Sequence, residues 1–129
     1  MKSIYAVVLL ALFSGCAARS KVKLSENLPE KFPAHAGPVC MLKSPLPNNV
    51  GYLIIGQIDS SKRTYGSVSE LLPLMAADAR NIGADAIVNL NTGQKFGLLA
   101  WARPVGTGTA VKLKDPASIN CLSLGGELR

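Results

Sequence analysis

The chain has 129 residues, of which 48% are hydrophobic and only 5% are aromatic. Lys and Arg number 14 against 8 Asp and Glu, so the formal net charge at pH 7 is +6. This length suits one domain with a single core and is short for two. The positive charge does not indicate nucleic-acid binding, because the cations are dispersed along the chain and the few aromatic residues offer no stacking surface.

The first part of the chain has the features of an export signal. Lys2 is followed by an uncharged apolar run, residues 4–13 (IYAVVLLALF), which at about 1.5 Å per residue is too short to cross a hydrocarbon core of about 30 Å. Two small residues then precede Cys16, which resembles the lipobox of bacterial lipoproteins, with Phe13 where Leu is usual. The alternative is an ordinary secretory signal in which Cys16 is incidental. We expect residues 1–15 to be a lipoprotein signal peptide and Cys16 to be the lipidated residue.

The residue after the lipobox bears on location. Ala17, rather than Asp, follows Cys16, and the sorting rule of Gram-negative lipoproteins then implies an anchor in the outer membrane, facing the periplasm. Removal of residues 1–15 takes away one basic and no acidic residue, which leaves 13 minus 8, a net charge of +5. An exported protein also meets little nucleic acid, so we expect no nucleic-acid partner.

Residues 16–38 are predicted to form a lipidated, flexible tether. The stretch is polar, contains several prolines and has no sustained hydrophobic period. About 20 flexible residues span roughly 25 Å and would hold the domain away from the bilayer. Arg19, Lys21 and Lys23 are expected either to rest on anionic headgroups or to be solvated. His35, the only histidine, is expected to be a solvated linker residue.

Cys40 and Cys121 remain once Cys16 carries lipid. In an oxidising compartment two remaining thiols most simply pair with each other. A metal pair or a redox pair is the alternative, but neither cysteine lies in a C-x-x-C motif. We therefore expect a structural disulfide, with no metal site and no cofactor.

Residues 39–129 are predicted to form a single α+β domain. Residues 38–50 (PVCMLKSPLPNNV) combine a short apolar run with prolines and two asparagines, which favours an edge strand followed by a turn. Residues 51–60 (GYLIIGQIDS) are rich in β-formers and predict a strand of about seven residues. Gly56 within it is expected to be a bulge or a point of close backbone approach.

One helix is predicted next. Ser67 and Glu70 have the spacing of a capping box, whereas Ser69 is the alternative N-cap and would place Pro73 nearer the helix start. Apolar residues then recur at helical spacing until Gly83, which is expected to end the helix in the left-handed conformation.

Three strands are predicted after the helix, at residues 86–91, 96–103 and 106–113, with the turn sequence RPVG between the last two. The order strand, helix, strand favours a parallel pair with a right-handed crossover if both strands join one sheet. The expected architecture is one helix packed on a small mixed sheet, a β-α-β core followed by a β-hairpin.

Candidate functional residues are few. The only histidine lies in the expected tether, and the carboxylates show no spacing that demands a pair, so we expect no enzymatic activity. Leu99, Trp101 and Arg103 alternate onto one face of the strand predicted at 96–103 and form a candidate partner surface if this face is outward. If it faces inward, Trp101 is a core residue. We expect core or half-buried packing, because the single tryptophan of a small domain is usually needed inside.

The segment LIIGQIDSSKRTYGSVSELLPLMAADARNIGADAIVNL resembles the lipoprotein domains of the RcsF type and, more loosely, the YbjQ-like β-α-β proteins. The similarity covers roughly residues 50–92. It implies an outer-membrane lipoprotein that touches envelope proteins and passes stress signals inward. We therefore expect a non-enzymatic protein that acts by protein contact, in envelope stress sensing or in an envelope assembly. The alternative is a periplasmic small-molecule or metal-binding module, although oxidised thiols leave a soft metal few ligands.

Overall fold

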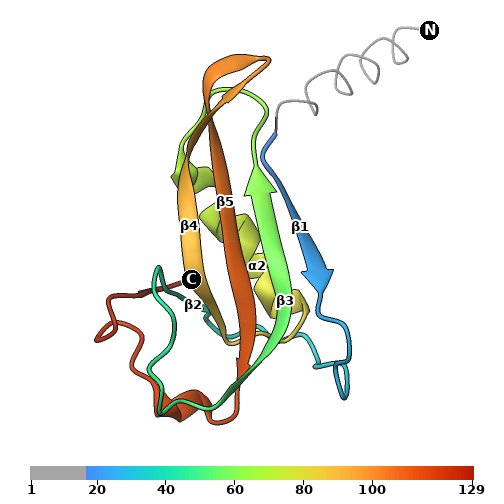
Figure 1. Cartoon of the computed structure of the whole chain (residues 1–129), viewed down its shortest axis with the longest axis vertical. Helices are drawn as coiled ribbons and strands as arrows, with labels where there is room; N and C mark the ends of the chain where they lie inside the picture. The colour runs from blue at the N-terminus through green and yellow to red at the C-terminus, as the bar shows by residue number, and fades with distance from the viewer. Residues whose placement is uncertain (1–16) are drawn as a thin grey trace, which may run out of the picture.

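The computed structural model describes residues 17–129, so the expected signal peptide at 1–15 and the expected lipidation site Cys16 lie outside the described residues. In the described part, one α-helix packs against a six-stranded mixed sheet (Figure 1). The α+β prediction is therefore confirmed. In chain order the elements are β1 (Arg19–Leu24), β2 (Cys40–Met41), β3 (Tyr52–Ser61), the 3₁₀ turn η2 (Val68–Glu70), α2 (Leu72–Asn81), β4 (Ala86–Gly97), β5 (Ala100–Leu113), the 3₁₀ turn η3 (Pro116–Ser118) and β6 (Glu127–Leu128).

The sheet has the strand order β1-β3-β5-β4-β2-β6. β5 is antiparallel to both β3 and β4, so β3 and β4 run in the same direction with β5 between them. The predicted parallel pair is therefore wrong in one respect, since the two strands are parallel but not neighbours. The reason is the short β4–β5 hairpin, which folds β5 back along β4 and leaves the other edge of β5 to pair with β3.

The β4–β5 hairpin turns at a place that was not predicted. β4 continues through residues expected to be a loop, and the turn lies at Leu98 and Leu99 rather than in the RPVG sequence. Pro104 of that sequence is buried within β5. Its carbonyl accepts a hydrogen bond of 3.1 Å from the backbone N–H of Lys62. This contact lies past the end of β3, where β5 needs no ladder donor, so the missing N–H of proline is tolerated.

The predicted capping box is present but begins the 3₁₀ turn η2. The Ser67 hydroxyl accepts from the Ser69 N–H, and the Glu70 carboxylate accepts from the Ser67 N–H at 2.7 Å. α2 follows directly, with Pro73 in its first turn, and Gly83 ends it with a φ of +82° as predicted. No helix in residues 17–129 is both long enough and apolar enough to cross a bilayer.

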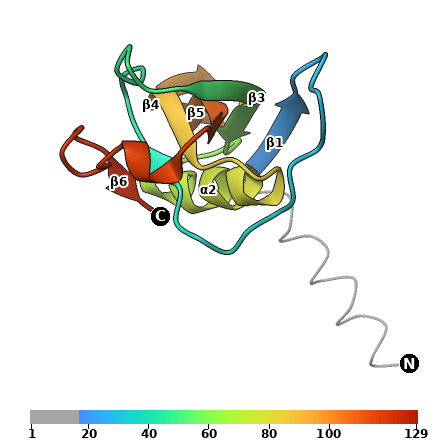
Figure 2. The ribbon, with the colours of Figure 1, turned by 90° about the horizontal axis from the view of Figure 1, so that it is seen from below.

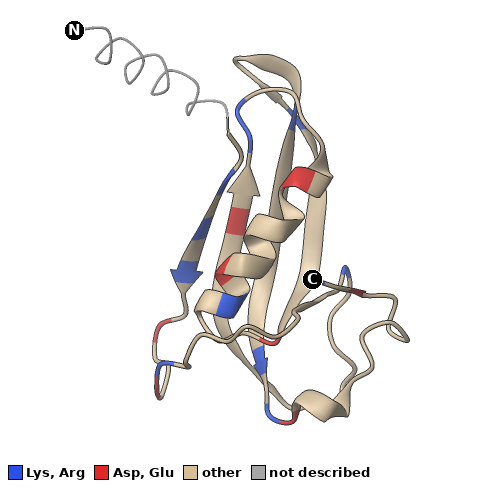
Figure 3. Ribbon diagram, turned by 180° about the vertical axis from the view of Figure 1, so that it is seen from behind, with Lys and Arg blue, Asp and Glu red and all other residues tan. Residues whose placement is uncertain are grey.

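Two hydrophobic clusters lie on opposite faces of the sheet. α2 covers the first (Figures 2 and 3), whose largest members include Ile55, Ile58, Met75 and Ile87. The second is covered by residues 42–51 and by the segment after β5, and it includes Leu42, Val88, Val111 and Leu113. The predicted disulfide between Cys40 and Cys121 is formed within this second cluster. It ties the C-terminal segment to β2.

The flexible tether predicted for residues 16–38 is wrong for the part that the structure describes. β1 pairs antiparallel with β3, from Arg19 opposite Ser61 to Leu24 opposite Gly56. His35, expected to be solvated, is half-buried, and its ring contacts the carbonyl of Ala84 at 2.6 Å. The segment packs because the apolar side chain of Val22 reaches the core under α2. The first strand of the described residues therefore begins at Arg19, three residues after Cys16, inside the predicted tether.

Candidate contact site

Large apolar side chains gather at the end of the sheet where β4 turns into β5. We call this the hairpin end, and it consists of the exposed residues Tyr65, Phe96, Leu98, Leu99 and Trp101. Leu98 is fully exposed and Trp101 is 78% exposed. The expected core packing of Trp101 is therefore wrong. The reason is its position, because β3 ends opposite Val105, four residues further along β5, and within residues 17–129 no strand flanks the hairpin on that side beyond this point.

Contacts between the hairpin and the loop after β3 hold the hairpin end together. The backbone N–H of Trp101 donates to the Tyr65 hydroxyl at 3.1 Å, and the Gln94 side chain donates to the carbonyl of Gly66 at 3.1 Å. The rings of Phe96 and Trp101 meet edge to face, with centroids 5.7 Å apart. The exposed aromatic side chains thus belong to the β4–β5 hairpin and the loop after β3, which are joined by these hydrogen bonds.

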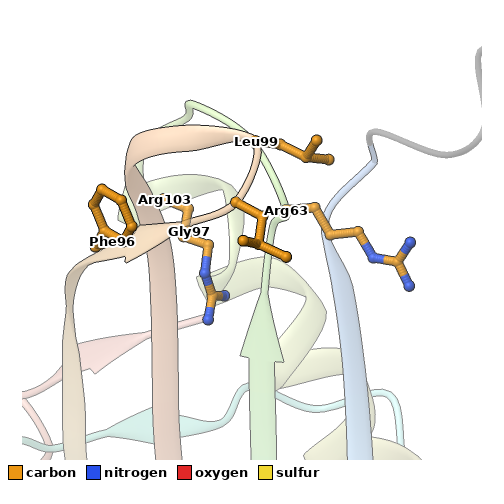
Figure 4. Close-up of a pocket in the computed structure, with 6 residues that line it drawn as sticks. Arg63, Phe96, Gly97, Leu99 and Arg103 are labelled. Carbon is orange, nitrogen blue, oxygen red and sulfur yellow. The ribbon is translucent and has the colours of Figure 1, made fainter.

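A hollow of about 680 Å³ opens beside the turn (Figure 4). Its lining combines apolar side chains with two arginines and contains no acidic residue: Arg63, Phe96, Gly97, Leu98, Leu99 and Arg103. Arg103 lies against the backbone of Gly97, where a Cβ atom would come within 2.7 Å of its Cδ atom. The hollow can accept a ligand with an anionic head and an apolar body.

The beginning of the described chain lies beside the same end of the sheet. A second hollow, of about 330 Å³, is lined by Ala17, Arg19, Ser20, Lys21, Asp59, Ser61 and Arg63. Arg63 belongs to both hollows, and Figure 4 shows its side chain extending from the hairpin end toward β1. Ala17, the first described residue, therefore lies near the hairpin end.

The charges near this end are mainly positive and unpaired. Lys62 is paired, because its ammonium lies 3.0 Å from the Glu70 carboxylate. Hydrogen bonds from the Ser67 N–H and from Lys62 hold the pKa of Glu70 below its usual value. Within residues 17–129, neither Arg63 nor Arg103 forms an ion pair. Both guanidinium groups are therefore available to an anion.

Further basic residues lie on the face of the sheet opposite α2, beyond the hairpin end. Lys23 is aligned with Gln57 and Thr109, and Thr109 pairs with Val88 of the cluster opposite α2. Side chains at alternate positions of β1 share this face. We call it the outer sheet face, and its charged residues are Arg19, Lys21, Lys23, Asp59, Lys95 and Arg103. Five cations against one carboxylate make it complementary to an acidic surface.

The predicted site residues fall into three places. Leu99 belongs to the turn itself, and Trp101 and Arg103 follow it in β5, where the pairing with β4 is irregular. Leu99 and Arg103 line one hollow, whereas Trp101 lies beside Tyr65 and Phe96. Cys40 and Cys121 lie at the opposite end of the domain, and Cys16 is outside the described residues. No group of three or more His, Cys, Asp or Glu side chains in residues 17–129 is arranged to hold a metal ion.

Sequence reasoning missed the contributions of Arg63, Tyr65, Phe96 and Leu98. The stretch FGLLAW carried a readable signal for two of them, because it holds more large apolar residues in succession than one face of a strand requires. Arg63 and Tyr65 lie in a separate loop and reach the site only through the pairing of β3 with β5. Comparison with protein-family models, with curated proteins and with solved structures finds no match to the chain.

Proposed function

We propose that the protein is a non-enzymatic lipoprotein, anchored at Cys16 in the outer membrane, that faces the periplasm and acts by contact with another envelope protein. The contact would serve envelope stress sensing or assembly. The observation that carries this proposal is the cationic outer sheet face, which begins only three residues after Cys16. Consecutive Cα atoms are about 3.8 Å apart, so a lipid on Cys16 keeps Arg19 within about 11 Å of the attachment point.

This short connection restricts the class of partner. A long tether would let the domain reach far into the periplasm, whereas three residues hold the sheet at the membrane surface. The partner we propose is therefore a protein embedded in, or resting on, the same membrane. Its contacting surface is acidic, since the outer sheet face offers five cations and one carboxylate.

A photo-reactive amino acid at Thr107, an exposed position in the middle of the outer sheet face, tests this contact. We expect irradiation of native membranes to join it to a defined protein that mass spectrometry identifies. The variant Lys23→Glu with Lys95→Glu reverses two charges of this face and should lower the yield at least tenfold. The variant Lys43→Glu with Lys114→Glu changes two exposed lysines elsewhere and should leave the yield unchanged.

The same preparation tests the anchor. The proposal expects Cys16 to carry a diacylglycerol and to be the first residue of the purified protein. An unmodified Cys16 would contradict the proposal. A cross-linking yield at Thr107 that is unchanged by the charge reversal would also contradict it.

A small-molecule binding module is the second candidate, favoured by the hollow between Arg63 and Arg103. Its ligand would be an anionic amphipathic compound. Native mass spectrometry of the purified protein tests it, because a retained small anion that is lost in Arg103→Gln would favour this function over protein contact. A soft metal is a weaker fit, since Cys40 and Cys121 are joined and the His35 ring already contacts Ala84 and Gly37.

A further inference from the structure

The hairpin end carries more exposed apolar surface than folding explains. Leu98 and Leu99 form the turn itself, and Phe96 and Trp101 flank it on the two strands. None of the described residues covers these side chains. Exposed apolar groups of this size, gathered at one end and rimmed by polar groups, mark a surface that another component covers.

We propose that the hairpin end inserts into the headgroup–acyl boundary of the phospholipid bilayer that also holds the lipid on Cys16. The inference rests on the proposed function for that lipid. It deepens the proposal by naming the partner of the apolar surface, while the outer sheet face beyond Arg103 remains available to protein.

The hairpin turn and Cys16 can reach the same membrane surface, because the turn and the beginning of β1 lie at the same end of the sheet. Arg19, Ser61 and Val105 lie in one row across β1, β3 and β5. From this row the hairpin continues five residues to Ala100, roughly 16 Å at about 3.3 Å per residue. Cys16 lies at most about 11 Å from Arg19 along the chain. Insertion by about 5–10 Å, which is usual for interfacial segments, therefore lets both reach the same membrane surface.

The chemistry of the hairpin end fits phospholipid. Tryptophan, tyrosine and phenylalanine beside leucine are the side chains that occupy the membrane interface. Arg63 and Arg103 line the hollow next to them and lie where lipid phosphates would be met. The absence of acidic residues from this lining, among the residues that the structure describes, removes repulsion from an anionic surface.

A second attachment point has a consequence for the contact function. A lipid alone leaves the domain free to rotate about its link to the membrane. An inserted hairpin end fixes the orientation of the sheet, so the outer sheet face is presented sideways at a constant height above the lipid. A membrane-embedded partner would then meet it without the entropic cost of orienting the domain.

Trp101 is the only tryptophan of the chain, so its fluorescence reports on the hairpin end directly. The full lipidated protein is reconstituted into vesicles of phosphatidylethanolamine with a minority of phosphatidylglycerol and of phosphatidylcholine brominated at defined acyl depths. We expect bromines near the interface to quench Trp101. The emission maximum should lie to the blue of that of the Cys16→Ala protein without vesicles.

Variants separate insertion from simple proximity. Leu98→Asp with Leu99→Asp keeps Trp101 in place and should reduce the quenching at least threefold. Leu122→Asp is the matched control, because Leu122 is 69% exposed, similar to Leu99 at 65%, but lies near Cys121 at the disulfide end. Its quenching should equal that of the unmodified chain. Equal quenching in all three proteins would overturn the inference.

The remaining outcomes are distinct from a failure of the anchor. Protein that floats with the vesicles, carries lipid on Cys16 and shows no quenching would keep the proposed function and overturn insertion. Protein without lipid on Cys16 would contradict the proposed function. In that case, quenching of Trp101 on addition of vesicles would still support insertion, and no quenching would overturn insertion. A photo-reactive residue at position 98 that reacts with a protein rather than with lipid in native membranes would also overturn it.

Discussion

The two ends of the sheet use similar residues in opposite ways. At the disulfide end, Leu113 of β5 is buried together with Leu42 and Leu46 of the covering segment 42–51, and the Cys40–Cys121 bridge ties the second covering segment to β2. At the hairpin end, Leu98 and Leu99 are exposed, and the nearby loop touches the hairpin only at its side. The fold is closed at one end and open at the other.

This difference separates the residues that stabilise the protein from those that remain for contact. Burial of a leucine contributes about 1.5–3 kcal/mol to folding, and the leucines at the hairpin end forgo this contribution. The cross-link and the covering coil thus lie at the end whose leucines are buried, and the exposed side chains of the other end are left without a stabilising role. Changes at the disulfide end should therefore alter stability, whereas changes at the hairpin end should alter contact.

The largest expected effect comes from removing the disulfide. Cys40→Ser with Cys121→Ser frees a loop with a sequence separation of 81 residues in the unfolded chain. We expect the free energy of unfolding to fall by about 4 kcal/mol, because the cross-link no longer restricts the unfolded ensemble. Urea unfolding followed by circular dichroism measures it. An unchanged midpoint would show that the covering coil closes this end without the bridge.

Removal of the His35 ring should have a smaller effect. Its Nδ1 atom accepts from the Gly37 N–H at 3.0 Å, so Nε2 carries the proton and donates to the Ala84 carbonyl. His35→Ala should lower the free energy of unfolding by about 1–2 kcal/mol, the contribution of two part-buried hydrogen bonds. Ala36→Ser, at an exposed neighbour, is the control. Equal stability of the two variants would show that the contacts of His35 do not stabilise the fold, as expected if residues 25–38 formed a flexible tether.

The capping box predicts a modest dependence on pH. Because the folded protein lowers the pKa of Glu70 below 4.5, its carboxylate adds stability above this pH, and the contribution is lost as the pH falls through the folded value. Glu70→Gln should lower the melting temperature slightly at pH 7, and the difference from the unmodified protein should shrink below pH 4.5. A difference that stays constant with pH would mean that the charge is not responsible.

The smallest effect on stability is expected at the hairpin end. Leu98→Ser with Leu99→Ser changes two exposed side chains, so the free energy of unfolding should move by less than about 0.5 kcal/mol. Thermal unfolding measures this directly. A loss of more than about 1 kcal/mol would show that these leucines serve the fold and would remove the contrast between the two ends.

The candidate site could be predicted only in part from the chain. Leu99, Trp101 and Arg103 could be named because they follow one another along the chain near the turn. Arg63 and Tyr65 come from a loop more than thirty residues earlier and join them through strand pairing. β1 was missed because its exposed face is made of Arg19, Lys21 and Lys23, which look like a solvated segment when the pairing with β3 is unknown.

The sequence by itself determined the features that depend on neighbours in the chain or on simple counting. These are the capping box at Ser67 and Glu70, the left-handed Gly83, the irregularity at Gly56, the Cys40–Cys121 bridge and the α+β class. The tertiary structure decided the insertion of β5 between β3 and β4, the entry of β1 into the sheet and the exposure of Trp101. Strand neighbours and burial depend on which distant segments meet, and this is set by total packing rather than by any local pattern.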